Sequence, residues 1–516
     1  MIEANNVGYR FPSAKTLSSG PIDLVVPEGQ FVLVTGQTGS GKSTLLRLLA
    51  GLVQRHGQGD VVGSALIDGE DAGTMRATDR ASKLAFVTQT PEDQLICQTV
   101  IDEVCFGLES TETPILEVTK LGSQWLARVG LDVDGDRHSS KLSGGQQQRL
   151  VLASAMAGGA EVLLLDEPLA QLDPPGATDL VHQLREMATE GCTVVVVEHR
   201  LDELWSAADR VVLIDAGRVV VDGPPTDVDL EPFRDLGLSL PPLVDLNDQL
   251  AARGLTIDDL SFSEKDLTDE AAIPSDRPIV LSLPALQHKY DGADTLALST
   301  EPMCFRAGER VAVIGVNGSG KSTLLHQILA HGPKNQPGFS IMVPQNADLT
   351  LFNGSVLEEL SFAPREAGQD EPSALKAAHA AADALGISSL LDSPPHALSK
   401  GQRVRVAVAA AMSCHPTMMV LDEPTAGQDG DQMHQMLDAL ALGLVDGLLI
   451  FATHDVSLAL EYATRIIILE QGLVDFDGPP ADATNRLKDA TPWITFCHKV
   501  GVSIRHPSQF IEALDD

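Results

Sequence analysis

The sequence has few basic residues for its length. Its 516 residues include 36 Lys and Arg against 72 Asp and Glu, a formal net charge of −36. A surface this acidic repels phosphodiester backbones, which disfavours binding to nucleic acid or to a ribosome, and it is also typical of a well-solvated protein. Charged residues are only 21% and apolar residues 43% of the chain. The chain is therefore not intrinsically disordered and can bury a core in two or more domains.

Cysteine and long hydrophobic runs are also scarce. No two cysteines form a C-x-x-C pair, so neither a zinc site nor a disulfide framework is supported, and reduced thiols in the cytosol fit best. The most apolar segments, such as Thr193–Val197, are far shorter than the ~20 residues of a membrane span. Glu3 stands where a signal peptide would be basic, and no apolar run follows it. We expect a cytoplasmic protein that does not cross a membrane by itself.

What the sequence does contain is an internal repeat. Phe31–Thr44 (FVLVTGQTGSGKST) returns as Arg310–Thr323 (RVAVIGVNGSGKST), an offset of 279. Later segments repeat at an offset of 256, as in Gln89 and Gln345. Two copies of one domain are therefore predicted, at 1–228 and 280–485. The second copy is 23 residues shorter in a strand-like region that corresponds to Gly63–Gly69, so we expect it to have a smaller β subdomain.

Two segments lie outside the repeat. Residues 229–279 hold 12 acids, 4 bases and several prolines, and they are expected to form a linker with some local helix at Leu236–Leu240 and Leu243–Leu246. Residues 486–516 form a C-terminal tail without a counterpart after the first copy, and the sequence assigns it no role.

Each copy contains a G-x-x-x-x-G-K-S phosphate-binding loop (P-loop). The loop follows an apolar strand, Phe31–Thr35 or Arg310–Ile314, and opens a predicted helix, which is the context that supports the motif. Its glycines let backbone N–H groups surround phosphates at a helix N-terminus. The predicted nucleotide-binding residues of the two loops are Gly36, Gln37, Thr38, Gly39, Ser40, Gly41, Lys42, Ser43, Thr44, Gly315, Val316, Asn317, Gly318, Ser319, Gly320, Lys321, Ser322 and Thr323.

Within these loops, Lys42 and Lys321 would neutralise the charge of the β- and γ-phosphates of ATP. Ser43 and Ser322 would bind Mg²⁺. One such match could be a chance glycine-rich turn. Two matches in the same strand–loop–helix context make that explanation negligible.

Each copy also has a buried strand that ends in paired acids, Val162–Glu167 and Met418–Glu423. Acids at a strand end are often helix caps, but the upstream P-loop favours a catalytic interpretation. The first acid of each pair, Asp166 or Asp422, suits the Mg²⁺ shell. The second acid, Glu167 or Glu423, is placed to orient or deprotonate the attacking water.

Two further polar residues recur. His199 and His454 each end an apolar strand downstream of the acid pair, and this recurrence supports a catalytic contact to the γ-phosphate over a structural role. Gln89 and Gln345 each end an apolar segment and could reach Mg²⁺ or water.

One aromatic residue stands at the same place in both copies. Phe11 and Tyr290 each lie 25 residues before the first P-loop glycine. A single aromatic is more often part of a core, but the equal spacing favours stacking on a nucleotide base.

Together, the P-loop, the glutamine, a Leu-Ser-x-Gly-Gln signature, Asp-Glu and the histidine, in this order and twice, resemble the nucleotide-binding domains of ATP-binding cassette (ABC) proteins. The resemblance implies an α/β fold with two P-loop NTPase domains in tandem, each with a RecA-like core, an antiparallel β subdomain and a helical subdomain. It also implies hydrolysis of ATP with Mg²⁺ and head-to-tail pairing, in which each ATP lies between one domain's P-loop and the other's signature.

The resemblance assigns further residues. Site one would join Lys42, Gln89, Asp166, Glu167 and His199 to Ser399, Lys400, Gly401 and Gln402. Site two would join Lys321, Gln345, Asp422, Glu423 and His454 to Ser143, Gly144, Gly145 and Gln146. Asp173 and Asp429 match the D-loop aspartates that cross the interface.

The second copy departs from the family pattern at two positions. Lys400 replaces a glycine of the signature, and Gln428 replaces the leucine usual before the D-loop aspartate. A cation at a helix N-terminus opposes the helix dipole by ~0.3–1 kcal/mol, which a bound phosphate can offset. We expect site one to be altered rather than inactive.

The segment after Gln89 indicates which subfamily of ABC proteins the chain resembles. Thr90–Leu95 (TPEDQL), followed by T-V-x-x-E-V-x-F-G at Thr99–Gly107, is similar to ATPases of energy-coupling factor (ECF) transporters. Those ATPases drive import of vitamins or metal ions through a transmembrane T component and a substrate-binding S component. The resemblance therefore implies a peripheral protein on the cytoplasmic face of the membrane.

Other members of the family remain as alternatives. A soluble tandem ABC ATPase acting in translation would be expected to have a charged helical linker and a basic surface. Fused sugar-importer ATPases, another importer class, usually have a degraded second P-loop, whereas Gly315–Thr323 is intact. DNA-repair relatives carry long coiled coils between P-loop and signature, for which Lys42 and Ser143 lie too close in sequence.

Overall fold

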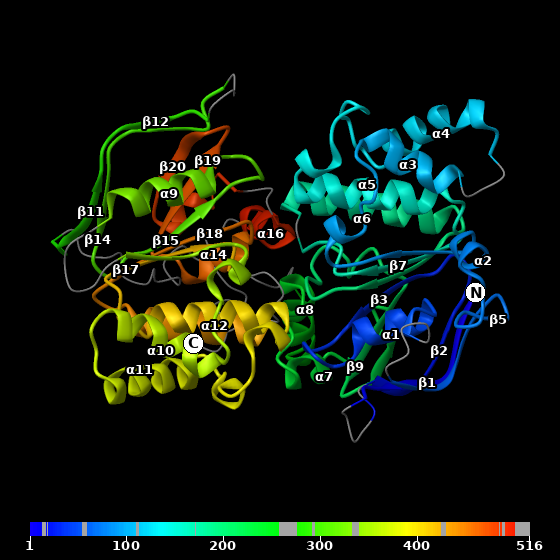
Figure 1. Cartoon of the computed structure of the whole chain (residues 1–516), viewed down its shortest axis with the longest axis horizontal. Helices are drawn as coiled ribbons and strands as arrows, with labels where there is room; N and C mark the ends of the chain where they lie inside the picture. The colour runs from blue at the N-terminus through cyan, green and yellow to red at the C-terminus, as the bar shows by residue number, and fades with distance from the viewer. Residues whose placement is uncertain are drawn as a thin grey trace. The chain divides into compact units, whose positions relative to one another are not determined.

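The computed structural model of the chain describes residues 1–12, 17, 19–53, 59–109, 113–170, 172–256, 276–290, 295–332, 340–424, 430–484, 486–487 and 491–500. The chain divides into two units, Met1–Pro241 and Pro242–Asp516 (Figure 1). The division falls inside the segment 229–279 that the sequence predicts to be a linker. Helix α7 (Glu231–Asp235) belongs to the first unit, and α8 (Pro242–Ala252) belongs to the second.

The main sheet of the first unit has six strands in the order β10-β9-β3-β8-β7-β6. All pairs are parallel except β9 with β10. Every residue of β3, β7 and β8 is buried, because helices cover both faces of a parallel sheet, and the strands therefore read as continuous apolar runs. The strands are β3 (Phe31–Thr35), β6 (Leu84–Val87), β7 (Val162–Asp166), β8 (Thr193–Val197), β9 (Arg210–Asp215) and β10 (Arg218–Gly223).

A second, antiparallel sheet of the first unit has the order β2-β1-β4-β5. Helix α1 (Lys42–Leu49) contacts strands of both sheets. Its residues Leu45 and Leu49 share one hydrophobic core with Ile2 of the antiparallel sheet and Val34 of the parallel sheet. The P-loop helix is therefore held from two sides. The strands are β1 (Ile2–Arg10), β2 (Ser19–Val26), β4 (Asp60–Ile67) and β5 (Glu70–Asp71).

A helical layer completes the first unit. Helices α3 (Val100–Glu109), α4 (Ile115–Arg128) and α5 (Gly144–Ala157) pack against one another, and α6 (Pro174–Thr189) contacts β8. The shorter helices are α2 (Ala77–Ala81), η2 (Pro91–Asp93) and η3 (Ser139–Lys141).

The second unit is built on an eight-stranded sheet in the order β12-β13-β20-β19-β15-β18-β17-β16. Strands β15 to β19 in this sheet are parallel, as in the first unit. The strands are β12 (Leu286–His288), β13 (Leu298–Thr300), β15 (Arg310–Ile314), β16 (Ser340–Val343), β17 (Met418–Asp422), β18 (Leu448–Thr453), β19 (Arg465–Glu470) and β20 (Leu473–Gly478).

The antiparallel sheet of the second unit pairs β11 (Ile279–Leu283) with β14 (Met303–Arg306), the two strands that the described residues contribute to it. The helices of this unit follow the same plan, with α10, α11 and α12 packed together. They are α9 (Lys321–His331), η5 (Ala347–Thr350), α10 (Val356–Glu366), α11 (Glu371–Ala384), η6 (Ser388–Leu390), η7 (Pro395–Ala397), α12 (Lys400–Met412), α13 (Gly430–Gly443), α14 (Val456–Tyr462), α15 (Pro480–Ala483) and α16 (Pro492–Val500).

Of the two helices predicted in the linker, one is present. Leu243–Leu246 lies in α8, but the expectation of helix at Leu236–Leu240 is wrong because α7 ends at Asp235. Gly237 adopts a left-handed φ of 61°, which ends a helix, and Pro241 follows shortly after. Residues 257–275 and 501–516 of the linker and tail lie outside the described residues. In the described part of the chain, every helix is too short or too polar to span a bilayer.

Candidate active sites

The two P-loops have the same backbone geometry. Gly36 and Gly315 have φ values of 149° and 157°, and a Cβ at either position would lie 2.0 or 2.4 Å from a strand carbonyl oxygen. The N-cap residues of α1 and α9 are Gly41 and Gly320, whose lack of a side chain leaves the first N–H groups of the helix available to an anion. Each loop is therefore a cradle that only glycine permits.

The P-loop lysines fold back over their own loops. Lys42 is 4% exposed, and its Nζ donates to the carbonyl oxygens of Gly36 (2.7 Å) and Gln37 (2.8 Å). Lys321 Nζ donates to Gly315 O (2.7 Å) and lies 3.6 Å from Glu423 Oε1. Both ammonium groups thus lie against their own loops, and their contact with phosphate stays a prediction.

The loops also hold buried hydroxyl groups. Ser40 Oγ and Ser319 Oγ are buried without a hydrogen-bond partner among the described residues. The Gln37 side chain, by contrast, does have a partner. Its Nε2 donates a hydrogen bond to Leu236 O (2.8 Å), just after α7. Both hydroxyls lie close to the first glycine of their loop, because a Cβ at Gly36 or Gly315 would be 2.9 or 2.5 Å from them.

Each P-loop serine bonds to the first acid of the strand-terminal pair. Ser43 Oγ donates to Asp166 Oδ1 at 2.8 Å, and Ser322 donates to Asp422 in the second unit. Burial raises the pKa of both carboxyls, because their charge lacks full compensation. A hydroxyl and a carboxylate side by side are the hard oxygen donors that Mg²⁺ prefers. The residues present therefore fit a divalent cation.

The first unit brings its second acid, glutamine and histidine together. Glu167 follows β7 in a left-handed conformation with φ 49°. Its Oε2 accepts a hydrogen bond from Gln89 Nε2, and its Oε1 lies 3.5 Å from His199 Nε2. Three side chains that are far apart in the sequence thus converge at the carboxyl edge of the sheet.

The second unit differs at this point. His454 Nδ1 lies 2.9 Å from Glu423 Oε2, whereas Gln345 is exposed and no hydrogen bond joins it to another described residue. Burial by itself raises the pKa of Glu423, but the hydrogen bond from His454 and the charge of Lys321 outweigh it and hold this pKa below its usual range. The hydrogen bond from His454 and the charge of Lys321 thus favour the carboxylate form of Glu423.

The paired aromatic residues are both on the surface. Phe11 is 47% exposed and packs edge-to-face against Tyr9. Tyr290 is 53% exposed, and its hydroxyl lies 3.0 Å from Thr323 Oγ1 of the P-loop. Neither is a core residue, so both have a ring available for stacking, and Tyr290 lies beside its loop.

The signature motifs begin helices in both units. Ser143 and Ser399 are the N-caps of α5 and α12, and each forms a reciprocal capping box with the glutamine three residues later. Asp173 caps α6 by accepting from Gly176 N (3.1 Å). Gln428 and Asp429 lie outside the described residues. The predicted composite sites need both units at once, and their head-to-tail pairing stays a prediction.

Sequence reasoning missed Glu198, a fully buried carboxyl at the end of β8. It accepts hydrogen bonds from Leu169 N (3.0 Å) and His199 N (2.8 Å). Burial, together with the charge of Glu167, raises the pKa of Glu198 to about 7. Its only signal in the sequence is its position, immediately before the recurring histidine.

The comparisons with known proteins cover nearly the whole chain. The sequence pattern of the ABC transporter family matches residues 20–170 and 299–426. A Methanosarcina mazei protein that carries the name of an ABC transporter ATP-binding protein is 34% identical over 93% of this chain and 89% of its own length. A Methanosarcina acetivorans protein of the same name is 31% identical over 100% of this chain and 91% of its own. A solved structure named RNase-L Inhibitor matches with a TM-score of 0.60 at 21% identity, covering 94% of this chain and 92% of that one. The predicted fold class, two P-loop domains in tandem, is confirmed.

The raised pKa of Glu198 predicts a pH-dependent stability. The folded protein binds this proton more tightly than the unfolded chain, so the stabilisation is complete below about pH 4.5 and is lost as pH rises through about 7. The full effect is about 3 kcal/mol. We expect the melting temperature of the wild type, relative to Glu198→Gln, to fall as pH is raised from 5 to 8 in calorimetry of the full chain. Glu28→Gln, at an exposed position, is the control for loss of one carboxyl. A difference that stays constant with pH contradicts the prediction.

Proposed function

The chain belongs to the ABC transporter family, and we propose that it is the ATP-hydrolysing motor subunit of an importer of the energy-coupling factor type. Family membership makes it an ATP-binding protein and an ATPase, as the sequence predicts. The observation that supports turnover in this chain is the convergence, at one sheet edge of each unit, of the P-loop with the strand-terminal acids, seen in the bond from Ser43 to Asp166.

The residues of each unit divide the chemistry among them. Lys42 and Lys321 neutralise phosphate charge from within the loop, and Glu167 and Glu423 orient the attacking water and take up its proton. His199 and His454, which lie beside these glutamates, are placed to contact the γ-phosphate.

Ser43, Gln89 and Asp166 in one site would hold Mg²⁺, as would Ser322, Gln345 and Asp422 in the other, an assignment that the serine–aspartate contacts support. The bound ion supplies charge neutralisation of the phosphate oxygens.

The two units are proposed to pair head to tail within the chain. Site one then uses the Ser399–Gln402 signature with Lys400, and site two uses the unaltered Ser143–Gln146 signature. The capping boxes support this use, because they leave both signature serines at a helix N-terminus, where phosphate is favoured.

A docking surface for the membrane partner is proposed after each site glutamine. In the first unit the buried carboxyl of Glu103 accepts hydrogen bonds from Ile96 N (2.9 Å) and Cys97 N (2.6 Å). Glu359, 256 residues later, does the same for Phe352 N (2.9 Å) and Asn353 N (2.8 Å). A buried carboxylate on a helix therefore fixes the same loop in both units.

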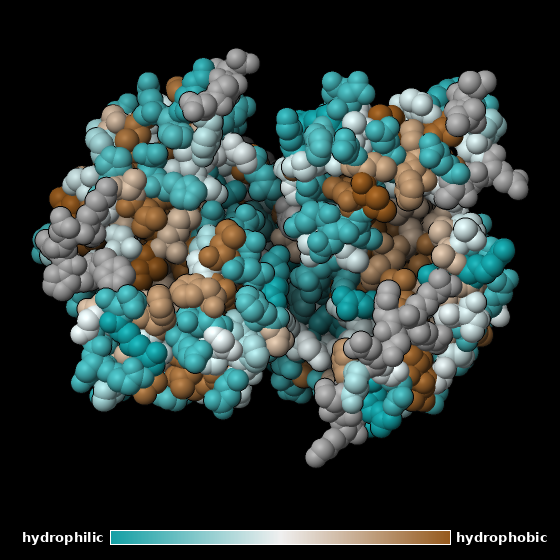
Figure 2. Space-filling view, in the orientation of Figure 1, coloured by the Kyte–Doolittle hydropathy of each residue, from teal (hydrophilic) through white to brown (hydrophobic). Residues whose placement is uncertain are grey.

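These fixed loops present apolar side chains to solvent. Ile96 is 72% exposed and Phe352 is 63% exposed, and Phe106 and Phe362 on the adjoining helices are exposed as well. Figure 2 shows that apolar side chains reach the surface of both units among polar ones. Large apolar residues held rigidly at a surface are typical of a protein interface. We assign them to a short helix of the transmembrane T component, whose S component would carry the vitamin or metal ion.

The two surfaces differ in charge. Glu92 and Asp93 of η2 are exposed on the rim of the first. In the second, Asp348 is paired with Arg403 of its own unit at 2.6 Å. A basic partner helix would therefore favour the first surface, which gives the membrane subunit one orientation. This arrangement would place the protein peripherally on the cytoplasmic face of the membrane.

The first prediction of the proposed function concerns ATP hydrolysis. Lys42→Ala combined with Lys321→Ala should lower phosphate release by the purified protein by orders of magnitude, because both cradles lose their cation. Glu167→Gln with Glu423→Gln should instead keep ATP bound while blocking its hydrolysis. Hydrolysis that survives in the double lysine variant would contradict the site assignment.

The second prediction is that the sites are unequal. In the proposed pairing, Glu423 faces the unaltered signature, whereas Glu167 faces the signature that carries Lys400. We expect Glu423→Gln to lower the steady-state ATPase rate about tenfold and Glu167→Gln to lower it less. The matched pair of variants is measured under the same conditions. Equal losses, or the reverse order, would refute the inequality.

The third prediction tests the membrane partner. Glu92→Lys with Asp93→Lys should abolish co-purification with membrane subunits while nucleotide binding is kept, because the rim charge is reversed. The matched control makes the same charge change at two other exposed positions of the first unit, Asp132→Lys with Glu161→Lys. Unchanged assembly and uptake, or co-purification with ribosomes instead of membrane proteins, would overturn the importer assignment.

A further inference from the structure

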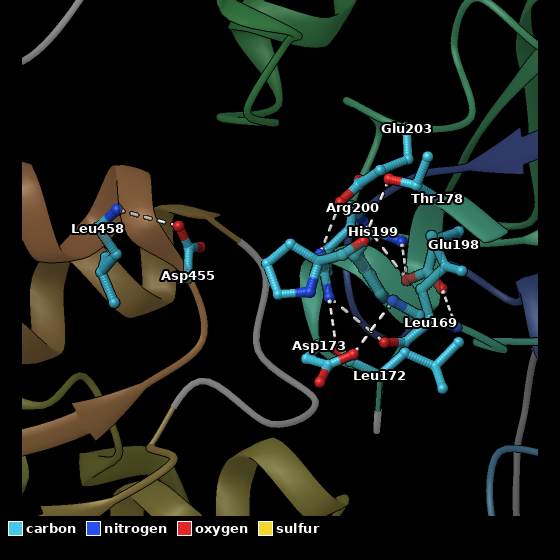
Figure 3. A network of polar contacts seen from close by, with 12 residues as sticks. Leu169, Leu172, Asp173, Thr178, Glu198, His199, Arg200, Glu203, Asp455 and Leu458 are labelled. Carbon is cyan, nitrogen blue, oxygen red and sulfur yellow. Dashed lines mark hydrogen bonds and ion pairs between the residues drawn. The ribbon is translucent and has the colours of Figure 1, made fainter. Parts of the chain in front are cut away.

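The buried Glu198 connects two segments of the first unit. It follows β8 directly and is 2% exposed. Its Oε1 accepts from His199 N (2.8 Å) and Arg200 N (3.4 Å), and its Oε2 accepts from Leu169 N (3.0 Å), as Figure 3 shows. One carboxyl group therefore ties the histidine segment to the loop that follows β7.

Arg200, on the other side of the histidine, binds the same loop. Its Nη1 lies 3.3 Å from the carbonyl oxygens of Leu169 and Leu172, to which it donates, and its Nη2 donates to Glu203 Oε1 at 2.6 Å (Figure 3). The ion pair with Glu203 fixes the guanidinium group. We call Glu198 and Arg200 the clamp, because together they bind one N–H and two C=O groups of this loop.

The clamped loop has a functional residue at each end. Glu167 precedes it and lies 3.5 Å from His199 Nε2. Asp173 follows it and caps α6. Any shift of Leu169 and Leu172 relative to His199 would thus break contacts of the clamp, whereas a shift of all three residues together would keep them.

The second unit has different residue types at the two clamp positions. Thr453 and Asp455 stand where the first unit has Glu198 and Arg200. Thr453 Oγ1 accepts from Asp455 N (3.0 Å), and Asp455 Oδ1 accepts from Leu458 N (3.0 Å) as the cap of α14. Both side chains serve their own segment, and a carboxylate has no proton with which to bind a loop carbonyl. Within the described residues, the arginine-type clamp is therefore a feature of the first unit.

We propose that Glu198 and Arg200 are positioning residues that make Leu169, Leu172 and His199 respond to nucleotide as one body in the first domain. The consequence rests on the proposed head-to-tail pairing. His199 then belongs to site one and Asp173 reaches site two, so the clamp couples the two sites to each other.

The test removes the donors of the clamp in the full chain. Arg200→Met, whose side chain has no hydrogen-bond donor, should speed hydrogen exchange of the backbone amides of Leu169, Ala170 and Leu172 about tenfold, because the loop loses its anchor. The same variant should lower kcat for ATP about tenfold and leave KM within twofold, since the P-loops are untouched. Arg200→Lys, which keeps a donor, should restore part of both values.

The control is Asp455→Asn, at the matching position of the second unit, where asparagine preserves the cap. It should change neither exchange at Leu169, Ala170 and Leu172 nor kcat. Wild-type exchange and kcat in Arg200→Met would overturn the proposal, and so would a parallel loss of melting temperature and nucleotide affinity, which indicates general destabilisation. The hydrogen-exchange result needs neither turnover nor a membrane partner. Failure of the importer assignment is therefore distinguishable from failure of the clamp.

Discussion

A hydrogen bond between a P-loop serine and a strand-terminal aspartate joins the two halves of each site. Ser43 and Asp166 come from segments more than a hundred residues apart, yet their oxygens lie 2.8 Å apart. The contact is possible because β3 and β7 flank β8 in one parallel sheet, whose carboxyl ends meet at the same edge. The glycine cradle, the lysine and the second acid all depend on this alignment.

Around that edge, buried carboxylates that accept backbone N–H groups fix the functional loops. Glu103 and Glu359 hold the loops of the proposed docking surface, and Glu198 holds the loop that ends in Asp173. A carboxylate with backbone donors is a strong, directional anchor, and it is costly to leave such a group unpaired. Acidic side chains are thus found inside the protein as well as on its surface, and the buried ones fix the backbone of these loops.

The two units share this plan but differ in the partners of their second acid. Gln89 donates to Glu167, whereas Gln345 is exposed, and the histidine contacts the glutamate through Nε2 in the first unit and through Nδ1 in the second. These differences lie within each unit. They give the two sites unlike side-chain geometry even though the sequence motifs are nearly the same.

The sequence by itself determined the repeat, the strands that end in Asp166 and Asp422, and the two P-loops, because each is encoded in contiguous residues with a characteristic pattern. It also identified the family. Only the tertiary structure decided which distant groups meet: that Glu198 bonds to Leu169, that His454 uses Nδ1 where His199 uses Nε2, and that Leu236–Leu240 forms no helix. Such contacts depend on how packed elements bring separate segments together, and side-chain geometry of this kind leaves no periodic trace in the chain.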